Sequence, residues 1–315
     1  MIKNKISILI PFLNEEDNID FLLNELSAFC NKNNSINWEI FFINDGSTDN
    51  SVQLLEKTCF SGFEGKVISL SKNYGSHAAL RAGILNATGD FVVFMYADLQ
   101  DPLEVILDLY NKIKKENISI VWGTRNNIPT GFVDRNFSKG YSHLMKNYAV
   151  PSYPEKGFDI VMFDQKVQQC LNENIEPNSS IFLQILTLGF KQSTVFYDKK
   201  VRKAGKSKWT FAKKIKLLVD SFVAFSYFPI RLVSTLGIIM FMLGFMFSIY
   251  LVLRKLIIGD LVHGWALTGS ILMMGFGVTN VSLGIIAEYL WRTMDYSRKR
   301  PVFIIDEIIE LKKVE

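Results

Sequence analysis

The stretch DFVVFMYADLQDP, residues 90–102, is an apolar run that ends in two carboxylates, an amide and a proline. The apolar part is typical of a buried strand, and Pro102 opens a helix-like stretch that extends to residue 116. A strand that leads directly into a helix is the repeating unit of an α/β sheet. Residues 90–102 therefore predict one strand–loop–helix unit, with its polar residues where the strand ends.

The same unit repeats along the first 125 residues. Apolar runs and helix-like stretches alternate, the runs at 5–13, 39–45, 66–70, 90–98 and 118–124, the stretches at about 16–31, 50–58, 77–87 and 102–116. This alternation predicts a mostly parallel sheet, and the near-continuous apolar strands fit a sheet with helices on both faces. Ligands bind beyond the carboxyl ends of such strands. Because the polar, acidic and glycine-rich residues gather at those ends, the pattern predicts a nucleotide site there.

The C-terminal third of the chain is much more apolar than the rest. It contains uncharged runs at 232–253 and 265–287. As a helix the first run would span ~33 Å, enough for a bilayer core of ~30 Å. The alternative is a pair of buried core helices, which fits poorly because helices this long and apolar all round are rare in such a domain. We predict two transmembrane helices within 232–290, preceded by an amphipathic membrane-surface helix at 211–231.

The distribution of charge predicts how these segments are oriented. Basic residues flank the pair of spans, whereas the loop between the spans holds only Arg254 and Lys255. The positive-inside rule then places the domain at 1–210 and a tail at 291–315 in the cytoplasm, and no signal peptide is recognised. The net charge of +4 is concentrated near the spans, which favours anionic lipid over nucleic acid as a partner. Three scattered cysteines fit free thiols in a reducing compartment.

Seven blocks of the sequence resemble family-2 glycosyltransferases with a GT-A fold. They occur in the family's order and are IPFLNEEDNI (10–19), INDGSTDNS (43–51), SKNYGSHAALRAG (71–83), ADLQDP (97–102), GTR (123–125), RNFSK (135–139) and RKAGKSKW (202–209). Together with the two spans, they are similar to the polyprenyl-phosphate branch, which includes dolichyl-phosphate mannose synthase and bacterial undecaprenyl-phosphate glucosyltransferases. The resemblance covers nearly the whole chain, and the order of the blocks is more specific than any single block.

This resemblance implies a fold and an activity. The fold is a Rossmann-like GT-A domain followed by the interfacial helix and two transmembrane helices. The activity is inverting transfer of one hexose from a nucleotide sugar, with UDP-glucose favoured, to undecaprenyl phosphate. The reaction would occur at the cytoplasmic face of a bacterial inner membrane and serve cell-envelope glycan modification. The apolar faces of only two spans also favour a homo-oligomer.

The resemblance also assigns residues to the nucleotide sugar. The expected nucleotide-binding residues are Pro11, Asn14, Glu15, Asp45, Gly75, Arg202 and Lys208. Asp45 would accept hydrogen bonds from the base, and Gly75 would let the backbone approach the diphosphate at a helix N-terminus. Alternatively, the Asp45 block is a tight turn in which Ser47 or Thr48 caps the next helix, and both roles are compatible. We expect His77 to be an ordinary first-turn residue rather than a phosphate ligand.

The resemblance places a metal at residues 98–100. Asp98 and Gln100 would hold Mg²⁺ or Mn²⁺, which stabilises charge on the departing nucleotide. The family commonly has Asp-x-Asp here, but Tyr96 occupies the first position and supplies no carboxylate. One carboxylate suffices when phosphate oxygens and waters complete the shell. Asp101 precedes a proline and is expected to cap the following helix.

The acceptor phosphate needs cations rather than a strong base, because it is already anionic. Arg125, Arg135 and Ser138 match the family's acceptor-phosphate residues. Asp159, in the block KGFDIVMFD (156–164), would act as a base, orient the sugar or only pair with an arginine. The expected catalytic residues are thus Asp98, Arg125 and Asp159.

Two other functions compete with this one. A non-catalytic scaffold that binds nucleotide sugar or lipid is favoured by Tyr96 alone. A processive polysaccharide synthase usually has more spans and a Gln-x-x-Arg-Trp motif, and the sequence has no such motif.

Overall fold

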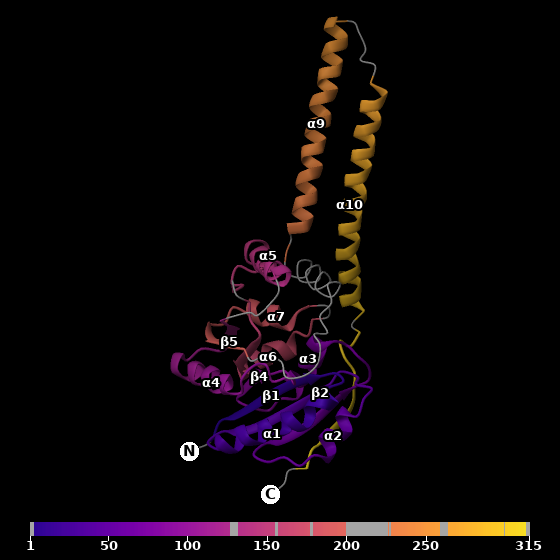
Figure 1. Ribbon diagram of the computed structural model, residues 1–315. Helices are drawn as coiled ribbons and strands as arrows, with labels where there is room; N and C mark the ends of the chain where they lie inside the picture. Colours follow the sequence, from indigo (N-terminus) through magenta and orange to yellow (C-terminus); the bar gives the residue numbers. More distant parts are fainter. Residues whose placement is uncertain are drawn as a thin grey trace. The chain divides into compact units, whose positions relative to one another are not determined.

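Figure 1 shows the computed structural model, which describes residues 3–126, 132–154, 157–176, 179–199, 226, 228–258, 264–298 and 300–312. The chain forms two compact units. The first contains 1–214 and 301–315, and the second contains 215–300.

The first unit is built on one sheet. Its eight described strands lie in the order β7-β5-β6-β4-β1-β2-β3-β8. Their bounds are β1 Lys5–Phe12, β2 Asn37–Asn44, β3 Glu64–Leu70, β4 Phe91–Phe94, β5 Ile120–Arg125, β6 Ile160–Asp164, β7 Gln192–Tyr197 and β8 Ile305–Glu310. β6 runs antiparallel to its neighbours β4 and β5, and β8 runs antiparallel to β3. The other pairs are parallel, which confirms the predicted mostly parallel sheet.

Helices cover both faces of this sheet. They are α1 Glu16–Lys32, α2 Ser51–Lys57, α3 Ser76–Asn86, α4 Glu104–Glu116, α5 Phe132–Tyr148, α6 Gln165–Glu173 and α7 Ile181–Thr187. The first four confirm the predicted helices to within about two residues at each end. The fourth strand differs, because β4 ends at Phe94 and residues 95–98 belong to the following loop.

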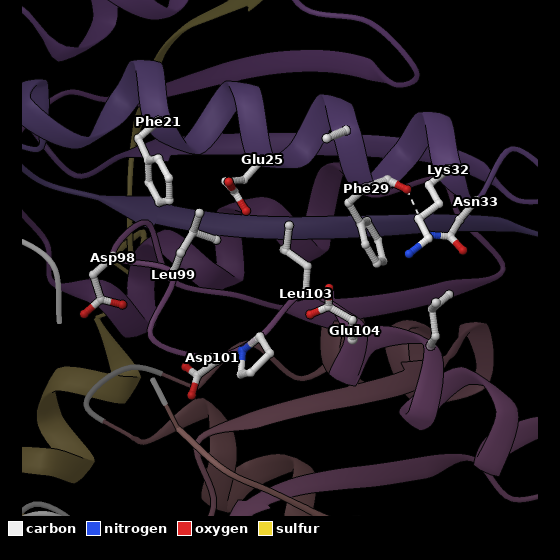
Figure 2. Close-up of a pocket in the computed structure, with 13 residues that line it drawn as sticks. Phe21, Glu25, Phe29, Lys32, Asn33, Asp98, Leu99, Asp101, Leu103 and Glu104 are labelled. Carbon is white, nitrogen blue, oxygen red and sulfur yellow. Dashed lines mark hydrogen bonds between the residues drawn. The ribbon is translucent and has the colours of Figure 1, made fainter. Parts of the chain in front are cut away.

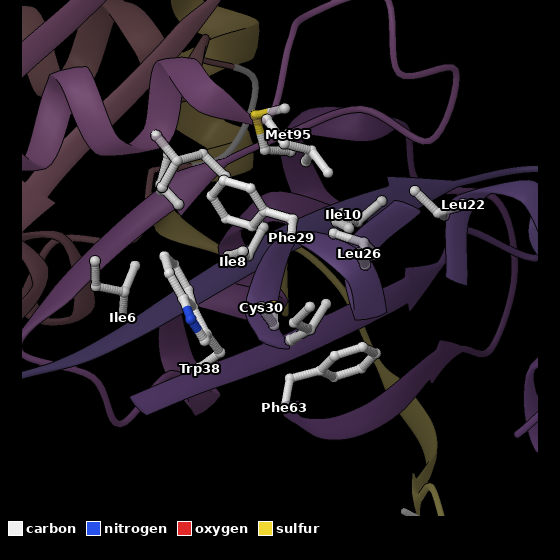
Figure 3. Close-up of a cluster of buried hydrophobic side chains, with 14 of the residues drawn as sticks. Ile6, Ile8, Ile10, Leu22, Leu26, Phe29, Cys30, Trp38, Phe63 and Met95 are labelled. Carbon is white, nitrogen blue, oxygen red and sulfur yellow. The ribbon is translucent and has the colours of Figure 1, made fainter. Parts of the chain in front are cut away.

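Alternation along β1 shows why its apolar run is unbroken. Ile6, Ile8 and Ile10 point toward α1, where Leu22, Leu26 and Phe29 belong to the same buried cluster (Figure 3). The intervening residue Leu9 lies against α3, close enough that a Cβ on Gly83 would be 3.0 Å from its side chain. Successive strand residues face opposite layers, so a strand covered on both sides needs apolar residues at nearly every position.

The C-terminal segment differs from the sequence interpretation. The tail predicted at 291–315 is not a separate segment, because 301–315 belong to the first unit and 305–310 form β8. The amide of Leu311 donates to the Gly65 carbonyl at 2.9 Å, and that of Ser71 donates to the Ile304 carbonyl at 3.0 Å. Residues that follow the last helix therefore complete the sheet edge and contact the loop after β3.

The second unit contains the helices α9, Phe228–Ile258, and α10, Trp265–Ser297, which contact each other. They include the two predicted apolar runs. Within the part of the chain that the structure describes, only α9 is long and apolar enough to cross a membrane by length and composition, over Ile230–Phe247. Residues of the predicted interfacial helix up to 225 lie outside the described residues.

Candidate active site

The loops that follow β1 and β2 hold each other in place. The amide of Asn14 donates to Ser47 Oγ at 3.0 Å, and Asn14 Oδ1 accepts from the Thr48 amide at 2.8 Å. The Glu15 amide donates to Ser51 Oγ at 2.9 Å. Ser47 and Thr48 therefore join the two loops instead of capping α2, whose first amide, that of Ser51, bonds to an Asp49 carboxylate oxygen. With Pro11 buried in β1, these contacts make one rigid polar edge.

Asp45 holds a third loop against this edge. Its side chain is buried and accepts from the amides of Tyr74 at 2.7 Å and Gly75 at 3.0 Å. Burial raises the pKa of Asp45, and the two amides oppose that rise. The Gly75 amide is thereby used inside the protein rather than offered to a ligand, which the sequence alone does not indicate. Asp45 fixes the position of residues 71–75.

Gly46 makes this arrangement possible. Its φ is +78°, and a Cβ there would lie 2.6 Å from the Asn73 nitrogen. Gly46→Ala is therefore expected to cost about 3 kcal/mol of unfolding free energy, from a left-handed backbone and a forced shift of the neighbouring loop. Gly189→Ala is the control, because Gly189 has φ +79° with open space around its Cβ, and about 1 kcal/mol is expected. Equal losses in denaturant unfolding would show that the loops are not in close contact at Gly46.

Gly75 and His77 begin α3. Gly75 has φ +93° and ψ 155°, a region that is essentially restricted to glycine, and its carbonyl accepts from the amides of Ala78 and Ala79. The His77 ring lies edge-on to Phe182 at 5.9 Å between centroids. Burial, with a smaller effect of Arg81, lowers the pKa of His77 to about 4. A neutral, packed imidazole fits the expected ordinary first-turn residue.

Residues 95–102 form a tight loop after β4. Asp98 and Leu99 lie at one end of a cleft whose opposite wall comes from α1, including Phe21 and Glu25 (Figure 2). Asp98 Oδ1 accepts from the Gln100 amide at 3.4 Å, and the Leu99 amide donates to the Tyr96 carbonyl at 3.2 Å. The main chain of Gln100 thus lies next to the Asp98 carboxylate, and both residues are half-buried.

The residues of this loop fit a hard divalent cation that takes most of its ligands from a bound diphosphate. A carboxylate and an amide oxygen are suitable ligands for Mg²⁺ or Mn²⁺. The described residues contain no group of three His, Cys, Asp or Glu side chains that would enclose a metal. Asp159 Oδ2, which interacts electrostatically with Tyr96 in this loop, is buried and has no hydrogen-bond partner among the described residues. The described residues thus offer few ligands, which suits an ion that takes its remaining ones from a diphosphate.

Tyr96 replaces a carboxylate where several already gather. Burial raises the pKa of its phenol, and Asp159, Asp101 and Asp98 raise it further. An aspartate in the same place would add a carboxylate within electrostatic reach of these three, and nearby like charges disfavour ionisation.

Arg125 and Asp159 form an ion pair beside this loop. Arg125 Nη2 lies 2.7 Å from Asp159 Oδ1, at the end of β5 and just before β6. Burial raises the pKa of Asp159, while Arg125 and Lys199 oppose the rise. Of the three roles considered for Asp159, the described contacts show pairing with an arginine. The pair brings one predicted acceptor residue to the same end of the sheet as Asp98.

Asp101 is not a helix cap. It is 1% exposed and accepts from the Tyr197 hydroxyl at 2.5 Å, and Lys199 Nζ lies 3.3 Å away. The sequence could not reveal this, because Tyr197 and Lys199 lie nearly 100 residues later in the chain than Asp101.

Four of the predicted residues cannot be placed in this site. Arg135 and Ser138 lie on α5, and their side chains are outside the described part of the chain. Arg202 and Lys208 lie outside the described residues.

Known proteins match both the fold and the sequence. A glucosyl-3-phosphoglycerate synthase from Mycobacterium tuberculosis, in a complex with Mn²⁺, UDP and phosphoglyceric acid, superposes with a TM-score of 0.50 at 16% identity, over 70% of this chain and 78% of that one, which shows the GT-A fold. An "Undecaprenyl-phosphate 4-deoxy-4-formamido-L-arabinose transferase" from Proteus mirabilis is 30% identical, covering 98% of this chain and 95% of the relative. A "Prophage bactoprenol glucosyl transferase homolog" from Escherichia coli K12 is also 30% identical, covering 96% and 99%.

The family assignment rests on sequence over more than half of the chain as well as on fold. Residues 7–174, which run from β1 to the end of α6, match the family described as "Glycosyl transferase family 2". Asp45, Asp98, Arg125 and Asp159 all lie within that range. The chain belongs to glycosyl transferase family 2 and is a glycosyltransferase.

Proposed function

We propose that this enzyme transfers one hexose, with inversion, from a nucleotide sugar to undecaprenyl phosphate at the cytoplasmic face of the membrane. The observation that carries the proposal is that two relatives, matched over nearly their full lengths, are named for an undecaprenyl-phosphate or bactoprenol acceptor. UDP-glucose is the favoured donor, from the glucosyl transferase name and the resemblance. The lipid-linked sugar formed would supply modification of cell-envelope glycans.

The rigid edge made by residues 11–15, 45–51 and 71–75 would receive the nucleotide. Pro11, Asn14 and Glu15 would line the base and ribose pocket. Because both oxygens of Asp45 accept loop amides, we assign it to shaping that pocket as well as to base recognition. Arg202 and Lys208 would close over the diphosphate.

Asp98 and Gln100 would hold Mg²⁺ or Mn²⁺, which when bound neutralises the diphosphate. Arg125 would bind the acceptor phosphate, helped by Arg135 and Ser138. A phosphate oxygen attacks the anomeric carbon from the face opposite the leaving group. The new carbon–oxygen bond forms as the bond to the diphosphate breaks, so the nucleoside diphosphate departs and the configuration inverts. An anionic acceptor needs orientation more than proton removal, which matches an Arg125 held by Asp159.

The C-terminal strand supports a two-span topology. A sheet cannot form across a bilayer, so 1–214 and 301–315, which share one sheet, must lie on the same side. The number of crossings between them is therefore even. If α9 crosses, then α10 must return, although by composition alone it is the less apolar helix. The distribution of Lys and Arg would put the catalytic unit and both termini in the cytoplasm.

This topology predicts the outcome of reporter insertions. Alkaline phosphatase, which is active only outside the cytoplasm, is expected to be active when inserted between residues 258 and 264. It is expected to be inactive when fused after residue 315. Activity at residue 315 would contradict the cytoplasmic placement of the catalytic unit, and inactivity at both sites would contradict any crossing.

The function is tested by transfer itself. The full-length protein in mild detergent is given undecaprenyl phosphate and, separately, labelled UDP-glucose, UDP-galactose, UDP-GlcNAc or GDP-mannose, with Mg²⁺, with Mn²⁺ or with EDTA. We expect label in the lipid phase from one donor, with loss of transfer in EDTA. Nucleotide binding without transfer from any donor would instead support the non-catalytic alternative that Tyr96 favours.

A further inference from the structure

The backbone between the two proposed metal ligands is strained. Leu99, between Asp98 and Gln100, has φ +44°, in the left-handed region. This conformation is uncommon for a bulky apolar residue, and strain of this kind persists only where surrounding contacts enforce it. Local contacts supply the Leu99 amide bond to Tyr96 and the Gln100 amide bond to Asp98. The latter is long, at 3.4 Å.

A stronger restraint is attached two residues further on. Asp101 is 1% exposed, and its carboxylate is bound by the Tyr197 hydroxyl at 2.5 Å and by Lys199 Nζ at 3.3 Å. A carboxylate buried to this degree is stable only with such partners. The three side chains connect the loop after β4 to the end of β7. Figure 2 shows Asp101 close to Asp98 and Leu99 on the same turn of chain.

Strand β7, which carries Tyr197, also pairs with the strand that carries Arg125. Tyr197 is the register partner of Arg125 in the β5–β7 pair, and the Asn126 amide donates to the Tyr197 carbonyl at 2.9 Å. Lys199 acts electrostatically on Asp159, the ion-pair partner of Arg125. The contacts of Asp101 therefore run from the strained loop directly to the strand end that holds Arg125.

We propose that Asp101, Tyr197 and Lys199 form a latch that keeps Leu99 in its left-handed conformation and thereby sets Asp98 and Gln100 at a fixed position relative to Arg125. None of the three touches substrate in this account; they are positioning residues. The latch rests on the proposed function, since it acts on the metal and acceptor residues of that site. As a consequence, the donor diphosphate and the acceptor phosphate would be positioned relative to each other by side chains that touch neither of them.

The test variant is Tyr197→Phe, which removes one hydroxyl and leaves the ion pair. Mn²⁺ binding in the presence of UDP is measured by calorimetry on the full-length protein, together with UDP binding in EDTA. We expect Mn²⁺ affinity to fall by roughly tenfold, the lower end for loss of a group that orients a metal ligand. UDP binding in EDTA is expected to be unchanged, because the nucleoside edge does not include the latch. Unchanged Mn²⁺ affinity would overturn the proposal.

A rescue experiment separates positioning from general damage. Leu99→Gly removes the steric cost of the left-handed backbone, so adding it to Tyr197→Phe is expected to restore at least half of the lost affinity on a logarithmic scale. Asn117→Gly is the matched control, because Asn117 has φ +49° after α4, and it should restore nothing. Absence of rescue by Leu99→Gly, or equal rescue by Asn117→Gly, would contradict the latch.

The wild-type protein separates this inference from the function on which it rests. Wild-type protein that binds neither UDP nor Mn²⁺ would count against the proposed function. Wild-type protein that binds both, with Tyr197→Phe indistinguishable from it, would count against the latch alone.

Discussion

Replacement of Asp98 by asparagine is expected to lower kcat/KM for transfer by about 10³-fold, the effect of losing several kcal/mol of charge stabilisation on the leaving group. Asp98 lines the cleft and its carboxylate accepts from the Gln100 amide, and the phenol of Tyr96 cannot supply a carboxylate in its place. The amide of asparagine keeps the size of the side chain and one oxygen but removes its charge. Initial rates with labelled donor and undecaprenyl phosphate measure the loss, and Mn²⁺ binding should weaken in parallel.

Glu104→Gln provides the control for this experiment. Glu104 lines the same cleft, is exposed and undergoes the same carboxylate-to-amide change. It belongs to the first turn of α4 rather than to the loop that carries Asp98. Its activity should remain within about twofold of wild type, as for most surface substitutions. Full activity of Asp98→Asn with transfer still abolished by EDTA would show that the metal is held elsewhere.

The parts of the fold that follow local patterns were predicted from sequence. Strands β1 to β5 and helices α1 to α4 were predicted, except that β4 ends at Phe94 rather than at residue 98. The strands are nearly continuous apolar runs, and α1 and α4 have a repeating apolar face. β8 was missed since its residues, IDEIIE, alternate weakly and carry three carboxylates, and most remain exposed. Its partner β3 lies more than 230 residues earlier in the chain. A local hydrophobic pattern does not reveal a pairing between strands so far apart in the sequence.

The site shows the same limit at the level of single side chains. Sequence places Asp45, Asp98 and Arg125 at strand ends, and the structure brings those ends to one edge of the sheet. Sequence does not show what each side chain already binds. Asp45 is occupied by two loop amides and Asp101 by Tyr197 and Lys199, because the partners are fixed only once the strands are assembled. In this site, Asp45 and Asp101 therefore hold the loops in place through internal contacts.

Asp159 either acts on the substrate itself or only positions Arg125, and a double-mutant cycle with Arg125 distinguishes these two roles. Arg125→Met is expected to lower kcat/KM for the acceptor by about 10³-fold, because the cation that binds the acceptor phosphate is lost. Asp159→Asn is expected to cost roughly tenfold, since Arg125 remains but loses its charged partner at 2.7 Å. If Asp159 acts only through Arg125, the double variant should be no worse than Arg125→Met, whereas an independent role would multiply the two losses.

The pH dependence gives a second criterion for Asp159. A base would leave an acidic limb in the rate profile that Asp159→Asn removes, whereas a positioning residue leaves the profile unchanged between about pH 6 and 9. Lys112→Met with Glu116→Gln is the control cycle, because that solvent-accessible ion pair, at 3.2 Å on α4, lies outside the site and should leave transfer unaffected. Burial raises the pKa of Asp159, which would favour a role as a base. The Arg125 guanidinium at 2.7 Å opposes that rise and holds the carboxylate in an ion pair. An acceptor that is already anionic gains little from a base, so we expect the cycle to be non-additive and the profile unchanged.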